Sequence, residues 1–541
     1  MKTKISFILL AIIGFISCDE YLDTVPKDRV TPPVVWESKQ NTTLYVNTFY
    51  AYLDRYGQFG NAQFSGSLTE GLTETLKYGS YVPGAGDANM YVFTPEVISP
   101  SGSLLGTWDA SYERIRRINE FLVDKKLYGN FDKETDELFE AQARFFRAFL
   151  YFELAKRHDG SVILYTDMNL VKDKDRAPAN EVWDQIEADL DYAISILPID
   201  WDAANKGRLT KGAVLGFKTR AMLYAKRWES SNKAADDLIA LNKYSLMPNY
   251  SDAWKGNNAE SILEYNYLLT GPNHNFDLTF SVFGEVENQG AMATPTQEMV
   301  ESYEKKDGTK VDWSPWRVAG GTTVRPPYAD LEPRFHATII YNGSTWKGKV
   351  MQNSVGGTNG RYMAYREATY PQGRTTTGYY LRKLVDEKHT DLQTNKSTQP
   401  WVAIRLAEVY LNKAEALYRL NKTAEALSYV NKIRERVGLP QKQGLIGEDL
   451  FKAIRQERKV ELSYEGLLYW DMLRWRLADK EYNNYRVHGF KITPAGSSDY
   501  NYEYVDCDLQ DRKFLTRVYI LPIPITELNN NSAIQQFEDW K

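Results

Sequence analysis

The sequence predicts a mainly α-helical protein built from tetratricopeptide-like helix pairs, with an irregular, loop-rich C-terminal portion that contains short strands. Two blocks of the chain, residues 41–242 and 402–477, carry apolar residues at intervals of three and four. Alanines recur at facing positions of successive helices, and a proline follows the second helix of a pair. Between the blocks, Gly, Thr, Asn and Pro become frequent and the helical period is lost.

The first block contains six predicted helices. The threonine at 210 is a helix-start signal, and Pro198 ends the helix before it. A polar, Gly-rich segment, Gly57–Gly106, separates the first two helices. The predicted helices are 41–56, 108–122, 132–157, 179–197, 210–227 and 232–242.

The rest of the chain is predicted to be irregular first and helical again afterwards. The run 337–341 is a candidate strand, and the Pro-limited run 519–524 is predicted to be an extended clamp against the body. The predicted helices are 296–303, 402–420, 424–437, 448–464 and 466–477.

Three helix pairs resemble one another, which predicts about four tetratricopeptide-like pairs in all. They begin with Arg147–Tyr151, Arg220–Ala225 and Lys413–Tyr418. Small residues at facing positions let paired helices approach closely. An unrelated set of antiparallel helices is the alternative. The predicted regions are 1–17 (leader), 18–250 (N-terminal helical region) and 251–541, which divides into a loop-rich insertion, 251–400, and returning helices, 401–480.

The N-terminus has the layout of a lipoprotein signal peptide. Lys2 and Lys4 precede an apolar run, 5–16, and Ser17 stands directly before Cys18. The run is too short for a spanning helix and is typical of a secretory signal. Cleavage before Cys18 would leave this cysteine at the mature N-terminus, where acylation can anchor the protein to a membrane.

Composition argues against several classes of protein. The formal net charge is −5 and no polybasic run occurs, so nucleic acid is a poor partner. With Cys18 acylated, Cys507 would be alone, which argues against an intramolecular disulfide and a thiolate zinc site. The five histidines show no metal-ligand spacing, and we expect no cofactor.

No catalytic motif stands out. A Gly-x-Ser-x-Gly elbow is absent, and the phosphate-loop near match at 343–350 has Val350 where a hydroxyl is needed. Gly84-x-Gly86 lacks the third glycine of a dinucleotide-binding loop. A glycoside hydrolase needs only two carboxylates, so the 71 acidic residues leave that class open.

The loops combine aromatic and amide side chains, which suits a sugar ligand. An aromatic face covers the C–H face of a sugar ring, and amides bind its hydroxyl groups. Packing of a loop on the body is an equal alternative for any single ring. The candidate ligand-binding residues are Tyr78, Tyr81, Asn89, Tyr91, Trp313, Trp316, Tyr328, Trp346 and Tyr362.

A series of landmarks, in this order along the chain, resembles the SusD/RagB family of Bacteroidetes outer-membrane lipoproteins. The landmarks are Cys18–Asp23, Trp108-x3-Tyr112-x2-Ile115-x3-Asn119, Arg144–Leu154, Pro295–Tyr303, Leu331–Phe335, Thr377–Lys383, Arg405–Ala416, Ile454-Arg455-x-Glu457-Arg458 and Tyr519–Pro524. Phe15, where Leu is usual, and Leu331-Glu332, where the family often has Asp, are small departures.

The resemblance implies a non-enzymatic glycan-binding protein that caps a SusC-like TonB-dependent transporter. It also implies a lipid anchor at Cys18 in the outer membrane, with the acidic residues behind it as a signal for the outer face. Ligand contacts would come from the loop before Trp108 and from the irregular middle region. The alternatives are a glycoside hydrolase, an interaction scaffold, and a variant of the same uptake system that binds peptide or another nutrient.

Overall fold

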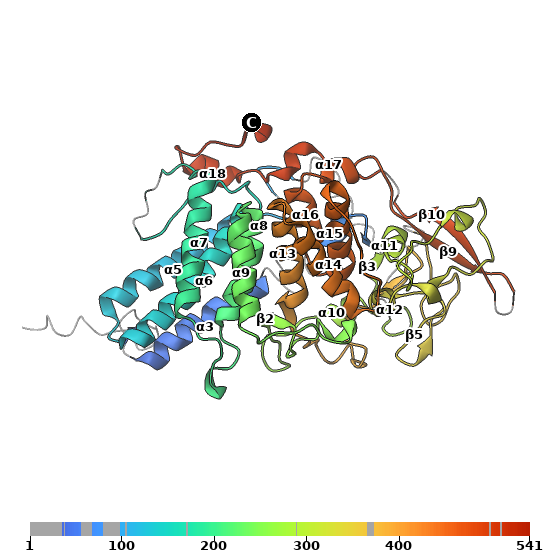
Figure 1. Cartoon of the computed structure of the whole chain (residues 1–541), viewed down its shortest axis with the longest axis horizontal. Helices are drawn as coiled ribbons and strands as arrows, with labels where there is room; N and C mark the ends of the chain where they lie inside the picture. The colour runs from blue at the N-terminus through green and yellow to red at the C-terminus, as the bar shows by residue number, and fades with distance from the viewer. Residues whose placement is uncertain are drawn as a thin grey trace, which may run out of the picture.

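Two helical blocks form one row of paired helices in the computed structural model (Figure 1). The model describes residues 35–541, except 37, 56–67, 79–97, 103–104, 169–170, 172, 288, 365–372, 497–498 and 509–510. α6 packs on α7, α8 on α9 and α13 on α14, while α13 also packs on α9 and joins the two blocks. The longer helices are α3 (Lys39–Arg55), α5 (Trp108–Tyr128), α6 (Lys133–Ala155), α7 (Ala179–Ile196), α8 (Lys211–Tyr224), α9 (Trp228–Ala240), α13 (Leu406–Arg419), α14 (Thr423–Arg436), α15 (Gly447–Glu461) and α16 (Leu468–Arg474).

Local capping explains where several helices begin. The Asp132 carboxylate accepts a hydrogen bond from the Thr135 N–H at the start of α6, at 2.8 Å. The Thr210 hydroxyl accepts one from the Ala213 N–H at the start of α8, at 3.2 Å. Each cap satisfies a backbone donor that the first helical turn leaves unpaired. The start signal predicted at Thr210 is therefore confirmed.

The irregular portion is held by short antiparallel strand pairs and single helical turns. The described pairs are β1 (Leu76–Tyr78) with β3 (Ala293–Pro295), β2 (Ser261–Tyr265) with β8 (Trp401–Arg405), β4 (Ile339–Ile340) with β7 (Tyr380–Leu381), β5 (Thr345–Trp346) with β6 (Lys349–Val350), and β9 (His488–Pro494) with β10 (Tyr500–Asp506). The short α-helices are α10 (Phe276–Thr279), α11 (Gln297–Ser302), α12 (Pro333–Thr338), α17 (Ala478–Glu481) and α18 (Ile525–Asn530). The 3-10 turns are η3 (Thr69–Leu72), η5 (Ala203–Asn205), η6 (Tyr250–Asp252), η7 (Ser314–Trp316), η8 (Tyr328–Asp330), η9 (Thr516–Tyr519) and η10 (Glu538–Trp540).

The helix predicted at 232–242 begins four residues earlier, at Trp228. Two other predicted segments differ in secondary structure. Residues 402–405 belong to β8, and the helix begins only at Leu406, because this stretch pairs with β2. In the run 337–341, Ala337 and Thr338 end α12, and only Ile339 and Ile340 form a strand. Tertiary pairing overrides local periodicity at both places.

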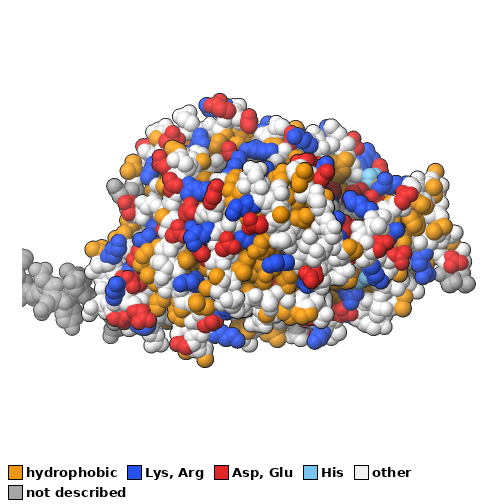
Figure 2. All heavy atoms as spheres, viewed as in Figure 1, with side chains coloured by type: hydrophobic (Ala, Val, Ile, Leu, Met, Phe, Trp, Pro, Cys, Tyr) orange, Lys and Arg blue, Asp and Glu red, His pale blue; other side chains and the backbone are white. Residues whose placement is uncertain are grey.

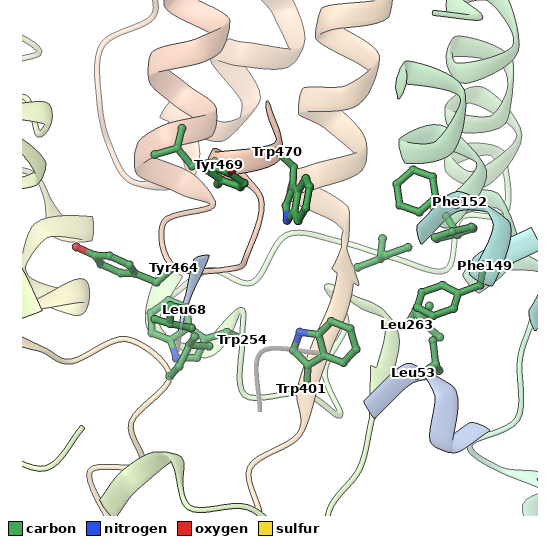
Figure 3. Packing of buried hydrophobic residues seen from close by; sticks show 14 of the residues in the cluster. Leu53, Leu68, Phe149, Phe152, Trp254, Leu263, Trp401, Tyr464, Tyr469 and Trp470 are labelled. Carbon is green, nitrogen blue, oxygen red and sulfur yellow. The ribbon is translucent and has the colours of Figure 1, made fainter. Parts of the chain in front are cut away.

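One large hydrophobic core joins the helices to the irregular portion. Leu53 of α3, Phe149 of α6, Leu263 of β2, Trp401 of β8 and Trp470 of α16 all belong to it (Figure 3). Each of these side chains is at most 8% exposed. Segments about 400 residues apart in the sequence therefore share one interior.

A buried ion cluster reinforces that junction. Arg334 of α12 contacts Glu457 and Glu461 of α15, at 2.5 and 3.2 Å. Arg405 of β8 contacts Glu260 and Glu461, at 2.7 and 2.6 Å. Burial opposes ionisation, but the guanidinium groups of the cluster hold the pKa of Glu461 below its ordinary value. The buried ion cluster consists of Glu260, Glu332, Arg334, Arg405, Arg436, Glu457, Glu461 and Glu465.

The C-terminal segment returns to the first helices as an extended clamp, as predicted. The Leu521 N–H donates to the Arg157 carbonyl at 2.8 Å, and the Leu521 carbonyl accepts from His158 Nδ1 at 2.9 Å. Burial lowers the pKa of His158 to about 3, so the ring is neutral at pH 7. Further along, the indole of Trp108 donates to Glu527 at 3.4 Å. None of the described helices is long and apolar enough to cross a membrane.

Candidate functional site

The structure describes six of the nine predicted ligand-binding residues, and it buries all six. Tyr81, Asn89 and Tyr91 lie outside the described residues, as does Cys18. The described rings are between 2% and 8% exposed: Tyr78, Trp313, Trp316, Tyr328, Trp346 and Tyr362.

These buried rings support the loops in which they lie. The Tyr78 hydroxyl donates to the Leu68 carbonyl at 2.6 Å, and the Trp316 indole donates to the Val324 carbonyl at 2.8 Å. The ring of Tyr328 stacks on Phe335, with centroids 5.6 Å apart. Protein atoms thus cover the faces of these six rings. Stacking of a sugar on them stays a prediction, because none of the six has an accessible face in this structure.

A different surface brings the irregular loops together. We call it the loop platform, and it consists of the segments 281–293, 357–364 and 373–377. The Gly373 N–H donates to the Gly290 carbonyl at 3.1 Å, and the Gly360 N–H donates to the Phe283 carbonyl at 2.9 Å. At one edge, Tyr78 at the end of β1 pairs with Ala293 of β3. The predicted ligand loop before Trp108 starts at this strand end.

The loop platform presents an aromatic ring beside two cationic side chains. The guanidinium carbon of Arg361 lies 4.1 Å from the ring centroid of Phe283, and that of Arg374 lies 5.4 Å from it. All three side chains are half-buried. Met292, also in the segment 281–293, is 44% exposed. An aromatic ring with planar hydrogen-bond donors around it matches the two faces of a sugar.

Hydrogen bonds underneath hold the loop platform in shape. The Thr375 hydroxyl accepts from the N–H groups of Thr377, Gly378 and Tyr379, at 3.0–3.1 Å. Gly290 has φ +98°, and a Cβ there would lie 2.3 Å from the Ser281 carbonyl oxygen, so only glycine fits. A rigid base keeps the ring and the guanidinium groups in fixed positions.

Sequence reasoning missed Phe283, Arg361 and Arg374. Phe283 lies among other apolar residues, such as Phe280 and Val282, with no motif to single it out. The two arginines are not adjacent in the sequence, and the hydrogen bond from the Thr375 N–H to the Arg361 carbonyl, at 2.8 Å, links their segments. The one available signal was that Arg361 and Arg374 flank the aromatic stretch containing Tyr362.

Charged groups elsewhere in the structure show no metal-binding arrangement. Within the described ranges, no three His, Cys, Asp or Glu side chains are grouped so that they could hold a metal ion. Burial raises the pKa of Glu70 to about 7, and this carboxylate accepts the Gly466 N–H at 2.7 Å. Cys507 is a buried free thiol that donates to the Thr376 carbonyl at 3.2 Å, in keeping with a structural role. On the face visible in Figure 2, acidic and basic side chains are interspersed.

Comparison with known families identifies the chain. The family model described as "SusD family" matches residues 259–540, about half of the chain. The chain belongs to the SusD family. A second family model, described as "Starch-binding associating with outer membrane", matches residues 21–223.

Curated relatives and solved structures agree with this assignment. SusD-like protein P38 of Formosa agariphila is 26% identical over 492 residues, which cover 87% of this chain and 91% of the relative. A SusD-like protein of Bacteroides ovatus is 25% identical and covers 91% and 86% of the two chains. A crystal structure of a SusD-like carbohydrate-binding protein from Bacteroides fragilis superposes with a TM-score of 0.75, at 24% identity, over 92% of this chain and 99% of that one. A laminarin-binding SusD-like protein gives a TM-score of 0.66, at 21% identity, over 92% and 99%.

The SusD landmarks have structural roles in this chain. Arg147 of α6 makes a bidentate pair with Asp189 of α7, at 2.7 and 2.8 Å, and donates to Asn119 of α5 at 2.9 Å. Arg458 of α15 donates to Asp471 of α16 at 2.9 Å. These buried pairs link successive helices, so the landmarks identify the helical frame.

Proposed function

We propose that this chain is a non-enzymatic, cell-surface glycan-binding lipoprotein that assists uptake through a SusC-like TonB-dependent transporter. The observation that carries the proposal is the loop platform, which sets Phe283 beside the guanidinium groups of Arg361 and Arg374. The starch-binding description of the matching family and the carbohydrate-binding and laminarin-binding neighbours support it.

The rigid helical frame and the shallow platform together suit reversible capture. The ring and two side chains offer one stacking face and a few hydrogen bonds, which corresponds to an affinity of roughly micromolar to millimolar. Weak binding allows release to a transporter. Tyr81, Asn89 and Tyr91, in the loop that begins at the platform edge, remain proposed ligand contacts.

The proposed place of action rests on the N-terminus. Acylated Cys18 would hold the protein at the outer membrane with its body in water, facing the cell exterior. Cys18→Ala in the full chain should move the protein from the membrane fraction to the soluble fraction. Retention of the variant in membranes would contradict the anchor.

Affinity electrophoresis and isothermal titration across a panel of polysaccharides test the function. We expect saturable binding to at least one of them, with no release of reducing ends during prolonged incubation. Folded protein that binds no member of the panel would contradict glycan binding, and release of reducing ends would favour the glycoside hydrolase alternative. Co-purification of a membrane transporter with the wild-type chain tests the partner.

A further inference from the structure

A second concave site lies between α3 and β2, well outside the loop platform. We call it the α3–β2 pocket. Its cavity volume is about 430 Å³, within the range of small-molecule sites. Its walls come from α3, the segment 200–210, residues 243–244 and the segment 257–266. It shares no residue with the loop platform.

One wall of the pocket is aromatic and held in place. The Tyr50 hydroxyl donates to Gln142 at 2.7 Å and accepts from the Leu209 N–H at 3.0 Å. The Trp201 indole donates to the Leu209 carbonyl at 2.7 Å. Both rings are half-buried, so each is fixed at one edge and still reaches the surface. Rings ordered in advance lose little conformational entropy when a ligand binds.

A third ring completes this wall. Tyr244 is also half-buried, and a Cβ at Gly212 would lie 2.2 Å from its hydroxyl oxygen. Only a glycine at position 212 lets this ring lie so close to α8. The pocket thus has three half-buried aromatic rings. The six buried rings of the irregular portion, by contrast, offer no free face.

Another part of the lining is polar and arranged in advance. The Glu264 carboxylate accepts from the Asn257 N–H at 2.8 Å and from the Ser261 hydroxyl at 2.5 Å. Asn266 donates to Glu264, and Asn257 donates to Asn266, each at 3.4 Å. Asn257 has φ +49°, and both asparagines are exposed. Amide groups so placed can pair with hydroxyl groups as donors and as acceptors.

The charges of the pocket nearly balance. Its lining includes Lys206, Arg208 and Lys243 as cations, and Asp200 and Glu264 as anions. Lys243 and Asp200 form an ion pair with each other. A site of this kind gives no strong preference for an anionic ligand. Aromatic rings and amides that line one cavity suit an uncharged ring with hydroxyl groups.

We propose that the α3–β2 pocket is a second binding site, which takes a neutral saccharide of one or two units. The sugar ring lies against Trp201 and Tyr244, and its hydroxyl groups pair with Asn257, Asn266 and Glu264. The site is independent of the loop platform. A chain with two sites can hold one polysaccharide at two points, which raises its effective affinity without new contacts.

Hydrogen–deuterium exchange of the full chain tests the proposal. The probes are neutral gluco-, galacto-, manno- and xylo-oligosaccharides. We expect at least one of them to slow exchange in peptides covering 200–210 and 257–266, and to do so equally in Phe283→Ala. Absence of protection there with every probe would overturn the proposal, and so would protection that disappears in Phe283→Ala.

Two variants locate the contacts without disturbing the fold. Asn257→Gly keeps the left-handed backbone and removes the amide, and Asn266→Ala removes the second amide from an exposed position. The double variant should weaken binding at the pocket by about tenfold, as expected for the loss of two hydrogen bonds. Exposed Lys255→Ala, outside the pocket, is the matched control and should bind as wild type does. Unchanged affinity in the double variant, or tighter binding of uronate oligosaccharides than of neutral ones, would overturn the proposal.

Discussion

The buried ion cluster and the loop platform use the same kinds of side chain in opposite ways. Arg334 and Arg405 are 1% exposed, and several carboxylates pair with their guanidinium groups. Arg361 and Arg374 are half-buried and lie over a phenyl ring at the surface. Arg334 and Arg405 belong to the family landmarks, whereas Arg361 and Arg374 belong to none. The charged residues of the family landmarks therefore identify the helical frame. The residues proposed to bind the ligand belong to no motif.

Removal of one cation from the buried ion cluster should have the largest effect. Arg405→Met removes the cation that contacts Glu260, Glu461 and Glu465. Arg334 and Arg436 then remain as the cations of the cluster for its five carboxylates, although Glu465 also keeps its pair with Lys383 outside it. We expect the free energy of unfolding to fall by about 3–5 kcal/mol, because uncompensated buried charges remain. Urea unfolding measures it. Arg116→Met, in an exposed pair with Glu120, is the control and should change stability by at most about 1 kcal/mol. Equal effects of both variants would contradict the comparison.

Acid should have the second-largest effect, which is to lower the stability of the helical frame. Burial opposes ionisation of Glu415, but Arg474 lowers its pKa to about 2. A folded-state pKa below the ordinary value gives stability that is present above pH 4.5 and is lost as the pH falls toward 2. Glu415→Gln should cost about 3 kcal/mol at pH 7. The difference from wild type should shrink in urea titrations at lower pH. A difference that does not change with pH would exclude this assignment.

A variant of the loop platform should weaken ligand binding without changing stability. Phe283→Ala removes the half-buried ring beside the two guanidinium groups. We expect the affinity for the bound polysaccharide to fall by about tenfold, the effect of one lost stacking contact. Val350→Ala, at a 61% exposed position of β6, serves as the control for titration and thermal unfolding. The platform assignment fails if Phe283→Ala binds as tightly as Val350→Ala.

The smallest expected effect concerns the β9–β10 hairpin. Its dependence on pH is opposite to that expected for Glu415. His488 contacts Glu298 at 2.6 Å and Asp506 at 3.2 Å, and although partial burial opposes its charge, Glu298 raises its pKa. Its contribution is complete below pH 6.5 and is lost as the pH rises through the raised value. His488→Gln should remove less than about 1 kcal/mol of stability at pH 6 and almost nothing at pH 9. Urea unfolding at the two pH values measures it, and a larger loss at pH 9 would contradict it.

The sequence predicted the helical frame well because periodicity and caps are local. α6 and α8 begin within a residue of the predicted starts, and Thr210 caps α8 through its own hydroxyl. Pairing between distant segments could not be predicted from local sequence patterns. Trp401–Arg405 is a strand only because β2 lies beside it, and the β9–β10 hairpin was not predicted.

Composition indicated aromatic loops but could not tell a buried ring from a free one. Trp346 and Tyr328 have the same residue types as a sugar-stacking site, yet both are at most 3% exposed. Exposure depends on what packs over a ring, and for Tyr328 that is Phe335 and Tyr341. Phe283 became a candidate only when its two arginine neighbours were visible in space.

The C-terminal clamp couples the order of synthesis to completion of the fold. His158 lies 363 residues before its carbonyl partner, Leu521, and the Arg157 carbonyl receives its N–H from the same residue. These two hydrogen bonds at the end of α6 therefore form only after residue 521 has been synthesised. The C-terminal clamp thus completes the packing of the first helical block late in synthesis.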